Sequence, residues 1–114
     1  MKIAAIATAL LLAGAAPAEA DLLPVQIKVW REIRQTFPKR YAQARRVARC
    51  ESHLLPWARN GQYLGVFQLS SSWRAYFRRY GIRTGPHHVH GQVVAAHLIF
   101  AGSGYRWTRW ECKP

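Results

Sequence analysis

The sequence PKRYAQARRVARCES, residues 38–52, decides the fold because it joins a helical apolar stripe to a cysteine and an acid. Its apolar side chains recur at helical spacing on one face, while most of the lysine and arginine side chains lie on the other. The inward-facing positions are Tyr41, Ala44, Val47 and Ala48. One more helical step along this stripe reaches Glu51. We therefore predict a helix over residues 38–52 that turns its single carboxyl toward the protein interior.

Glu51 is expected to resist ionisation. Burial against apolar side chains raises the pKa of a carboxyl because the charged form loses hydration, and a nearby helix C-terminus acts in the same direction. Neighbouring arginines oppose the shift. A carboxylic acid that stays protonated near neutral pH is suited to general acid catalysis on a glycosidic oxygen. From periodicity alone, the alternative is an ordinary salt bridge between Glu51 and an arginine, because ion pairs also perturb acids.

The segments around residues 38–52 predict a mainly α domain. Residues 22–37 form an apolar helical face with Pro24 in the first turn and Pro38 as the stop. That face comprises Leu23, Ile27, Trp30, Ile33 and Phe37. Residues 70–80 predict a short helix that begins at a Ser70 cap. Residues 89–101 are apolar almost all round, which predicts a central buried helix that ends at Gly102.

The remaining segments of the mature chain lack helical periodicity. Residues 54–69 contain Pro56, Asn60, Gly61 and Gly65, a composition that predicts a loop or a small hairpin. Residues 81–86 predict a turn, and residues 104–114 form an aromatic tail. No internal repeat or linker divides the chain, so we expect one domain.

The composition predicts one small, strongly basic, folded domain. The 114 residues include 17 Lys and Arg against 5 Asp and Glu, a formal net charge of +12, and 50% of them are hydrophobic. This balance excludes a large multidomain enzyme and argues against a disordered basic tail.

Residues 1–20 have the pattern of a secretory signal peptide. Lys2 precedes an apolar run, and Ala18-Glu19-Ala20 is a small-x-small cleavage site. The run is too short and too rich in alanine for a membrane-spanning helix. We predict a signal peptide over residues 1–20 and a secreted domain over residues 21–114, located outside the cell, in the cell wall or in the periplasm, with no integral membrane span after cleavage. The mature chain keeps the +12 charge, because the signal peptide holds one Lys and one Glu.

Two cysteines, Cys50 and Cys112, remain in this exported chain. An even count outside the cytosol predicts a disulfide between them. Such a bond closes most of the mature chain into one loop, worth roughly 4 kcal/mol on the chain-entropy model. Metal ligation is the weaker interpretation, since neither cysteine belongs to a CxxC pair.

Few carboxylates remain after export, which restricts the chemistry. They are Asp21, Glu32, Glu51 and Glu111. Chemistry that needs clustered carboxylates is excluded, including two-metal phosphoryl transfer and an all-oxygen calcium site. The histidines His87, His88 and His90 have no Cys or carboxylate close in sequence and border a Gly-Pro turn, so we expect a solvated loop there. We predict no metal and no other cofactor.

Three ordered motifs stand out along the chain, namely VARCES at residues 47–52, GQYLGVFQL at residues 61–69 followed by Trp73, and WEC at residues 110–112. Together they resemble bacterial lytic transglycosylases with a lysozyme-like fold, in particular the small secreted resuscitation-promoting-factor type. They span about residues 42–113. The resemblance implies a mainly α, single-domain, lysozyme-like fold. The chain departs from the family in the loop after Glu51, which has His53, Leu54, Leu55 and Trp57 in place of Asn-Pro-type turns, and in a closing motif one residue tighter.

The resemblance also implies roles for particular residues. Glu51 would be the catalytic acid and base, Gln68 a substrate-contacting amide beside it, and Tyr63, Ser70 and Trp73 the lining of a glycan groove. Glutamine offers both a donor and an acceptor to an N-acetyl group, and aromatic faces bury the apolar side of a sugar ring. The alternative to a role in the groove is that the side chains of Phe67, Leu69 and Trp73 belong to the hydrophobic core. His97, on an apolar helix, is expected to be a satisfied core residue or to lie within reach of the groove.

The activity that the resemblance implies is cleavage of the peptidoglycan linkage between N-acetylmuramic acid and N-acetylglucosamine, which leaves 1,6-anhydro ends. A two-carboxyl glycosidase mechanism lacks a second acid in a matching motif, so Glu51 is expected to act first as acid and then as base. The alternatives are a water-using muramidase, a non-catalytic wall-binding module and a cationic membrane-active protein. Peptidoglycan strands are the expected partner of a monomer. Nucleic acid is not expected, because the arginines are scattered and no recognised motif is present.

Overall fold

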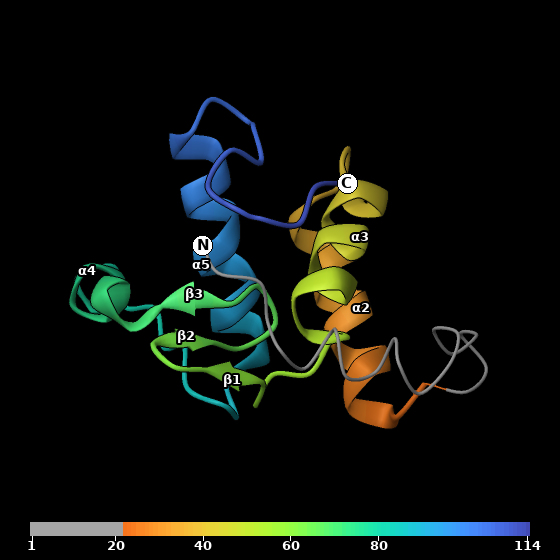
Figure 1. The fold of residues 1–114 in the computed structure, drawn as a ribbon, viewed down its shortest axis with the longest axis horizontal. Helices are drawn as coiled ribbons and strands as arrows, with labels where there is room; N and C mark the ends of the chain where they lie inside the picture. The colour runs from red at the N-terminus through yellow and green to blue at the C-terminus, as the bar shows by residue number, and fades with distance from the viewer. Residues whose placement is uncertain (1–21) are drawn as a thin grey trace.

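The predicted helices are present in the computed structural model, which describes residues 22–114 (Figure 1). The predicted signal peptide, residues 1–20, and Asp21 lie outside the described residues. The described part is mainly α, with a small sheet between its helices. In chain order the elements are α2 (Pro24–Thr36), α3 (Tyr41–Ser52), β1 (Arg59–Asn60), β2 (Tyr63–Leu64), β3 (Leu69–Ser70), the 3-10 helix η2 (Ser71–Trp73), α4 (Arg74–Arg79) and α5 (Val89–Gly102).

Helix α5 is central, as its all-round apolar sequence predicts. Helix α2 packs against both α5 and α3. Small side chains allow close packing at these contacts, and four alanines are fully buried, namely Ala44 and Ala48 of α3 and Ala95 and Ala96 of α5. Phe37, just after α2, joins the helical core to the C-terminal tail, because its ring lies 5.6 Å from that of Phe100 and 5.7 Å from that of Trp107. One hydrophobic core therefore includes residues from α2 to the tail.

Two residues predicted to face inward are instead exposed. Leu23 has 51% of its surface exposed and Tyr41 has 37%. Each lies at the start of its helix, outside the turns that pack on the core. The buried residues of α2 are Gln26, Val29 and Ile33. The Gln26 amide is satisfied inside the protein, since its nitrogen donates to the His53 carbonyl at 2.8 Å. A glutamine therefore occupies a core position, whereas the periodicity placed only apolar residues on the inward face of this helix.

The predicted hairpin is present and has a third strand that sequence analysis did not identify. The antiparallel order is β1-β2-β3, with Asn60 opposite Tyr63 and Tyr63 opposite Ser70. Strands of two residues are too short to show an alternating pattern. The predicted Ser70 cap is confirmed, because its hydroxyl accepts a hydrogen bond from the Ser72 N–H, but it begins η2 rather than one continuous helix.

Helix α5 ends at Gly102, as predicted. Gly104 follows with left-handed backbone, at φ 74°. The chain therefore turns two residues after the helix, toward the tail that carries Trp107 and Trp110.

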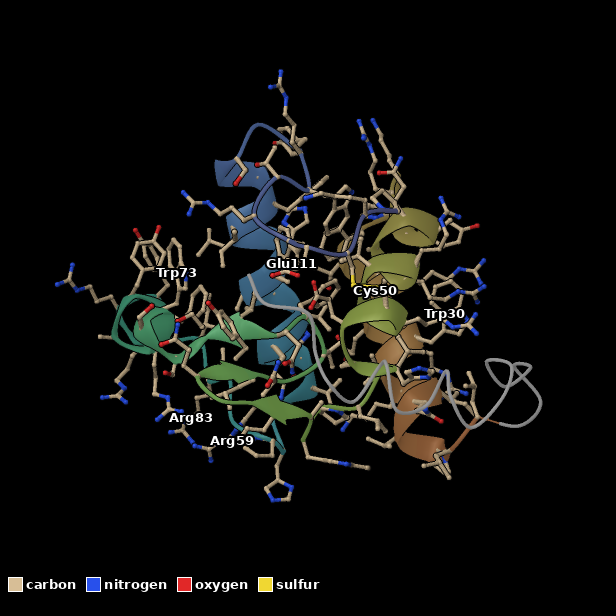
Figure 2. All side chains as sticks on the ribbon, viewed as in Figure 1. Trp30, Cys50, Arg59, Trp73, Arg83 and Glu111 are labelled. Carbon is tan, nitrogen blue, oxygen red and sulfur yellow. A yellow bond between two sulfur atoms is a disulfide. The ribbon has the colours of Figure 1, made fainter. Side chains whose placement is uncertain are left out.

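The predicted disulfide between Cys50 and Cys112 is present. Its Cα atoms lie 5.9 Å apart across a sequence separation of 62 residues. It fastens the C-terminal tail to the last turns of α3, where Glu51 follows Cys50 (Figure 2). None of the described helices is long and apolar enough to cross a bilayer.

At Gly91, helix α5 lies very close to the backbone of the loop before it. A Cβ atom at Gly91 would lie 1.7 Å from the backbone oxygen of Arg83. Backbone atoms cannot move aside as a flexible side chain does, so Gly91→Ala is expected to destabilise the fold by about 1–3 kcal/mol. Gly102, near the other end of α5, has open space around its Cβ direction. Gly102→Ala is therefore the matched control and should raise stability by about 0.5–1 kcal/mol.

Urea denaturation of the disulfide-bonded protein measures both effects. Equal unfolding free energies for Gly91→Ala and the parent would show that the loop at Arg83 moves away from α5 without cost.

Candidate active site

Glu51 is fully buried in the last turn of α3, as the stripe of residues 41–52 predicts. The backbone N–H of Cys112 donates to its Oε2 at 3.3 Å. Oε1 is buried and has no hydrogen-bond partner among the described residues. No described salt bridge involves Glu51, so the ordinary ion-pair interpretation has no support from the described residues. A buried carboxyl oxygen that lacks a partner is unfavourable when ionised and is available to a ligand when neutral.

The pKa of Glu51 is raised from 4.5 to about 7, chiefly because burial removes water from the charged form. The Cys112 N–H opposes the shift by donating to the carboxylate. The negative charge of Glu111 raises the pKa further, and the positive charge of Lys113 lowers it. At neutral pH both protonation states of Glu51 are therefore populated, as a group that donates and then accepts a proton requires.

The chain reverses direction directly after Glu51. His53 and Leu54 have left-handed backbone at φ 55° and φ 64°, which ends α3 and sends the chain toward the sheet. The Ser52 hydroxyl donates to the carbonyl oxygen of Val66 at 2.6 Å. Because Val66 is two residues before Gln68, this hydrogen bond brings the GQYLGVFQL segment to the end of α3.

Gln68 is fully buried at a left-handed backbone position, φ 51°. Its side-chain nitrogen donates to the carbonyl oxygens of Ala58 at 3.1 Å and Gly65 at 3.0 Å. Its Oε1 is buried and lacks a partner among the described residues. The prediction that Gln68 offers both a donor and an acceptor therefore needs correction, since the donor already holds the loop. The acceptor remains available.

Gln92 of α5 fixes the same loop and was missed by sequence analysis. Its Oε1 accepts from the Val66 N–H at 2.8 Å, and its Nε2 donates to the carbonyls of Pro56 and Gly85, each at 2.9 Å. Gly65 allows this contact, because a Cβ there would lie 2.4 Å from Gln92 Oε1. A lone glutamine on an apolar helix was the available signal, since a buried amide must find partners.

The three predicted groove residues come from the sheet and from η2, which begins directly after β3. Tyr63 and Ser70 are opposite each other in strands β2 and β3. Trp73 stacks on Phe77 and lines a cavity of about 190 Å³ with Arg109 and other residues of α4, α5 and the tail. Figure 2 shows Trp73 on the α4 side of the molecule and Cys50 on the α3 side. The contacts of Trp73 thus fit the core alternative, as do the buried side chains of Phe67 and Leu69.

Glu111 is a charged neighbour of the site that sequence analysis set aside. It is exposed, it precedes Cys112 in the chain, and its charge acts on Glu51. Figure 2 places Glu111 in the middle of the molecule near Cys50. The predicted disulfide carried this information, because any residue beside Cys112 must lie close to the end of α3.

The histidines lie elsewhere. His97 is partly buried, its ring lies 4.9 Å from that of Phe37 in an edge-on contact, and burial lowers its pKa. It lines a cavity of about 240 Å³ that does not include Glu51. His90 contacts Glu32 through Nδ1 and Oε2 at 2.7 Å. Within residues 22–114, no group of three or more His, Cys, Asp or Glu side chains is arranged to hold a metal ion.

No protein-family model matches this chain, and no curated protein or solved structure matches it at a significant level. The chemistry of Glu51 and its neighbours is therefore the basis for assigning a function.

The raised pKa of Glu51 makes folding stability depend on pH. The folded state binds the proton more tightly than the unfolded state, whose carboxyl has the ordinary pKa of 4.5. The free energy that protonated Glu51 contributes to folding is fully present below pH 4.5 and is lost as pH rises through about 7. Glu51→Gln keeps the shape and removes the titration. The parent should therefore lose about 3 kcal/mol relative to Glu51→Gln between pH 4 and pH 8.

Urea denaturation of both proteins across this pH range gives the difference. The comparison cancels the titration of the histidines, which both proteins share. A difference that does not change with pH would mean that Glu51 titrates as an exposed carboxyl.

Proposed function

We propose that this protein cleaves the glycosidic linkage between N-acetylmuramic acid and N-acetylglucosamine in peptidoglycan, with Glu51 as its single catalytic acid and base. The observation that carries the proposal is a buried carboxyl with a pKa of about 7 and one unpartnered oxygen. We take the fold to be lysozyme-like. In support, a helix that ends in an acid is followed by a small antiparallel sheet and a central buried helix.

The reaction needs two successive proton transfers at Glu51, one from the carboxyl and one to it. Neutral Glu51 donates its proton to the linkage oxygen as the bond to C1 of the muramic sugar breaks, with the 2-acetamido group assisting. The Glu51 carboxylate then accepts the proton of the muramic 6-hydroxyl, whose oxygen bonds to C1 and closes a 1,6-anhydro ring. No water is consumed and Glu51 returns to its neutral form. Burial of Glu51 favours this return, because the charged carboxylate is poorly hydrated.

The groups around Glu51 give the substrate its orientation in this proposal. The Oε1 of Gln68 accepts a hydrogen bond from the N–H of an N-acetyl group, since its own amide nitrogen is held by Ala58 and Gly65. Tyr63 and Ser70, opposite each other in the sheet, line the groove. The +12 charge attracts the anionic wall. We place the mature protein outside the cytoplasm, as a monomer that binds glycan strands.

A water-using muramidase is the second candidate, and Glu111 favours it. An exposed carboxylate whose charge acts on Glu51 is suited to accept the proton of an attacking water. Glu51 then serves only as the acid, and the product carries a free reducing end.

Digestion of purified peptidoglycan by the mature protein tests the proposal. Glu51→Gln should lower the rate about a hundredfold or more while wall binding is retained, because the variant lacks only the proton. Mass spectrometry of the parent digest should show anhydro ends, which are one water lighter than reducing ends.

Glu111→Gln is the matched control for removal of a nearby acid. It should retain activity if Glu51 acts alone, whereas loss of activity together with reducing ends would identify the muramidase. Undiminished digestion by Glu51→Gln would end both candidates, and wall binding without digestion by the parent would identify a binding module.

The pH dependence of digestion follows from the same carboxyl. The proton donor of the free enzyme disappears as Glu51 ionises, so kcat/KM should fall tenfold per pH unit above the Glu51 pKa of about 7. Initial rates of release of soluble fragments at low substrate concentration measure this profile. A profile that stays flat to pH 9 would show that the donor is another group.

A further inference from the structure

Two adjacent cavities lie along the loop of residues 80–88, the first against α4 and the second between α2 and the start of α5. The first, of about 420 Å³, is lined by Arg74, Arg78, Ile82, Arg83, Thr84, Gly85 and His88, and we call it the arginine pocket. The second, of about 480 Å³, includes Lys28, Glu32, His87 and His90 on its wall. Ile82, Arg83 and His88 line both cavities, so the two are adjacent, and we call the pair the depression.

The buried acid lies outside this depression, because Glu51, Gln68 and Tyr63 line neither cavity. The nearest approach to the proposed groove is a small third cavity, where Ser70 lies with Arg74 and Thr84. Figure 2 shows Arg83 below the small sheet, whereas Glu111 and Cys50 lie above it. The proposed cleavage of glycan strands therefore leaves the depression without an assigned role.

The arginine pocket carries positive charge, and no carboxylate of residues 22–114 lines it. Its three arginine side chains are exposed and none forms a salt bridge within residues 22–114. The one acid of the neighbouring cavity, Glu32, is already in contact with His90. The guanidinium donors of Arg74, Arg78 and Arg83 are therefore available to an external anion.

Phosphate is the anion that fits these donors. A guanidinium fork binds two phosphate oxygens at once, and a phosphate group offers enough oxygens for more than one arginine. The Thr84 hydroxyl adds a neutral donor on the same wall. Because the second cavity continues from the first with Lys28 and the histidines, a chain with successive phosphates fits the depression better than one isolated phosphate.

The walls also discriminate between phosphate polymers. Single-stranded nucleic acids bind through aromatic side chains on which the bases stack. The linings of both cavities include no Phe, Tyr or Trp. We propose that the depression binds a polyol phosphodiester chain, with successive phosphates held by the arginine pocket and by Lys28, and that this site works independently of Glu51.

Calorimetry with a glycerol-phosphate oligomer at fixed ionic strength tests the site. The pocket variant Arg74→Gln, Arg78→Gln, Arg83→Gln should bind at least about tenfold more weakly than the parent, since it loses charge-assisted hydrogen bonds. The control variant Arg31→Gln, Arg46→Gln, Arg106→Gln removes the same charge from exposed positions outside both cavities. Its affinity should fall less than about threefold, because distant charges are screened by salt.

Further arms identify the ligand. Arg78→Lys keeps the charge and loses the bidentate fork, so it should bind the oligomer more weakly than the parent does. Thermal unfolding confirms that each variant is folded. Inorganic phosphate and single-stranded DNA should both bind more weakly than the oligomer. The pocket variant should still digest purified glycan, because Glu51 is unchanged.

Equal losses in the pocket and control variants would show that net charge alone gives the affinity, and would overturn the proposal. It would also be overturned if the parent failed to bind the oligomer, or if DNA, inorganic phosphate or vesicles of anionic phospholipid bound as tightly as the oligomer.

Discussion

The covalent link between the end of α3 and the C-terminal tail is the constraint on which the site depends. The Cys50–Cys112 disulfide brings residues 62 positions apart together, so the Cys112 N–H reaches the Glu51 carboxyl. Within the tail, the Trp110 side chain is buried, and its indole N–H donates to the Phe67 carbonyl at 3.0 Å. The tail thus helps to bury Glu51 while one of its charges, on Glu111, favours the neutral acid. Removal of this link would expose the carboxyl and return its pKa toward the ordinary value.

The loop that follows α3 is held by polar side chains rather than by regular structure. Strands of two residues supply few ladder hydrogen bonds, so Ser52, Gln68 and Gln92 satisfy the backbone groups of residues 56–66. Each of these side chains is buried, where an unpaired backbone group would be costly. Among residues 22–114, the buried side-chain atoms without a hydrogen-bond partner are Oε1 of Glu51 and Oε1 of Gln68. In a site otherwise satisfied, two unpartnered oxygens are the natural positions for a ligand with hydrogen-bond donors.

The three arginines of the arginine pocket lie apart from the buried acid. Arginines of α4 and the following loop surround cavities that Glu51 does not line. With both activities, one small domain would hold a charged polymer in the arginine pocket. Glu51 would at the same time cleave a neighbouring neutral linkage. Long-range attraction depends on salt, whereas the contacts of a guanidinium fork depend on geometry. A result that contradicts one of the two proposals therefore leaves the other unaffected.

Local pattern determined most of the helices, the disulfide and the burial of Glu51, because helical periodicity and cysteine count act through neighbouring residues or simple pairing. It could not place Leu23 and Tyr41, since helix ends leave the core, nor find a third strand of two residues. Three features arise only when distant segments pack together. They are the hydrogen bonds from Gln92 to the loop after α3, the effect of Glu111 on the pKa of Glu51, and the position of Trp73 in a cavity with Arg109. The sequence by itself determined which side chain is the buried acid. Only the tertiary structure decided its pKa and its neighbours, because hydration and charge depend on distances in space rather than along the chain.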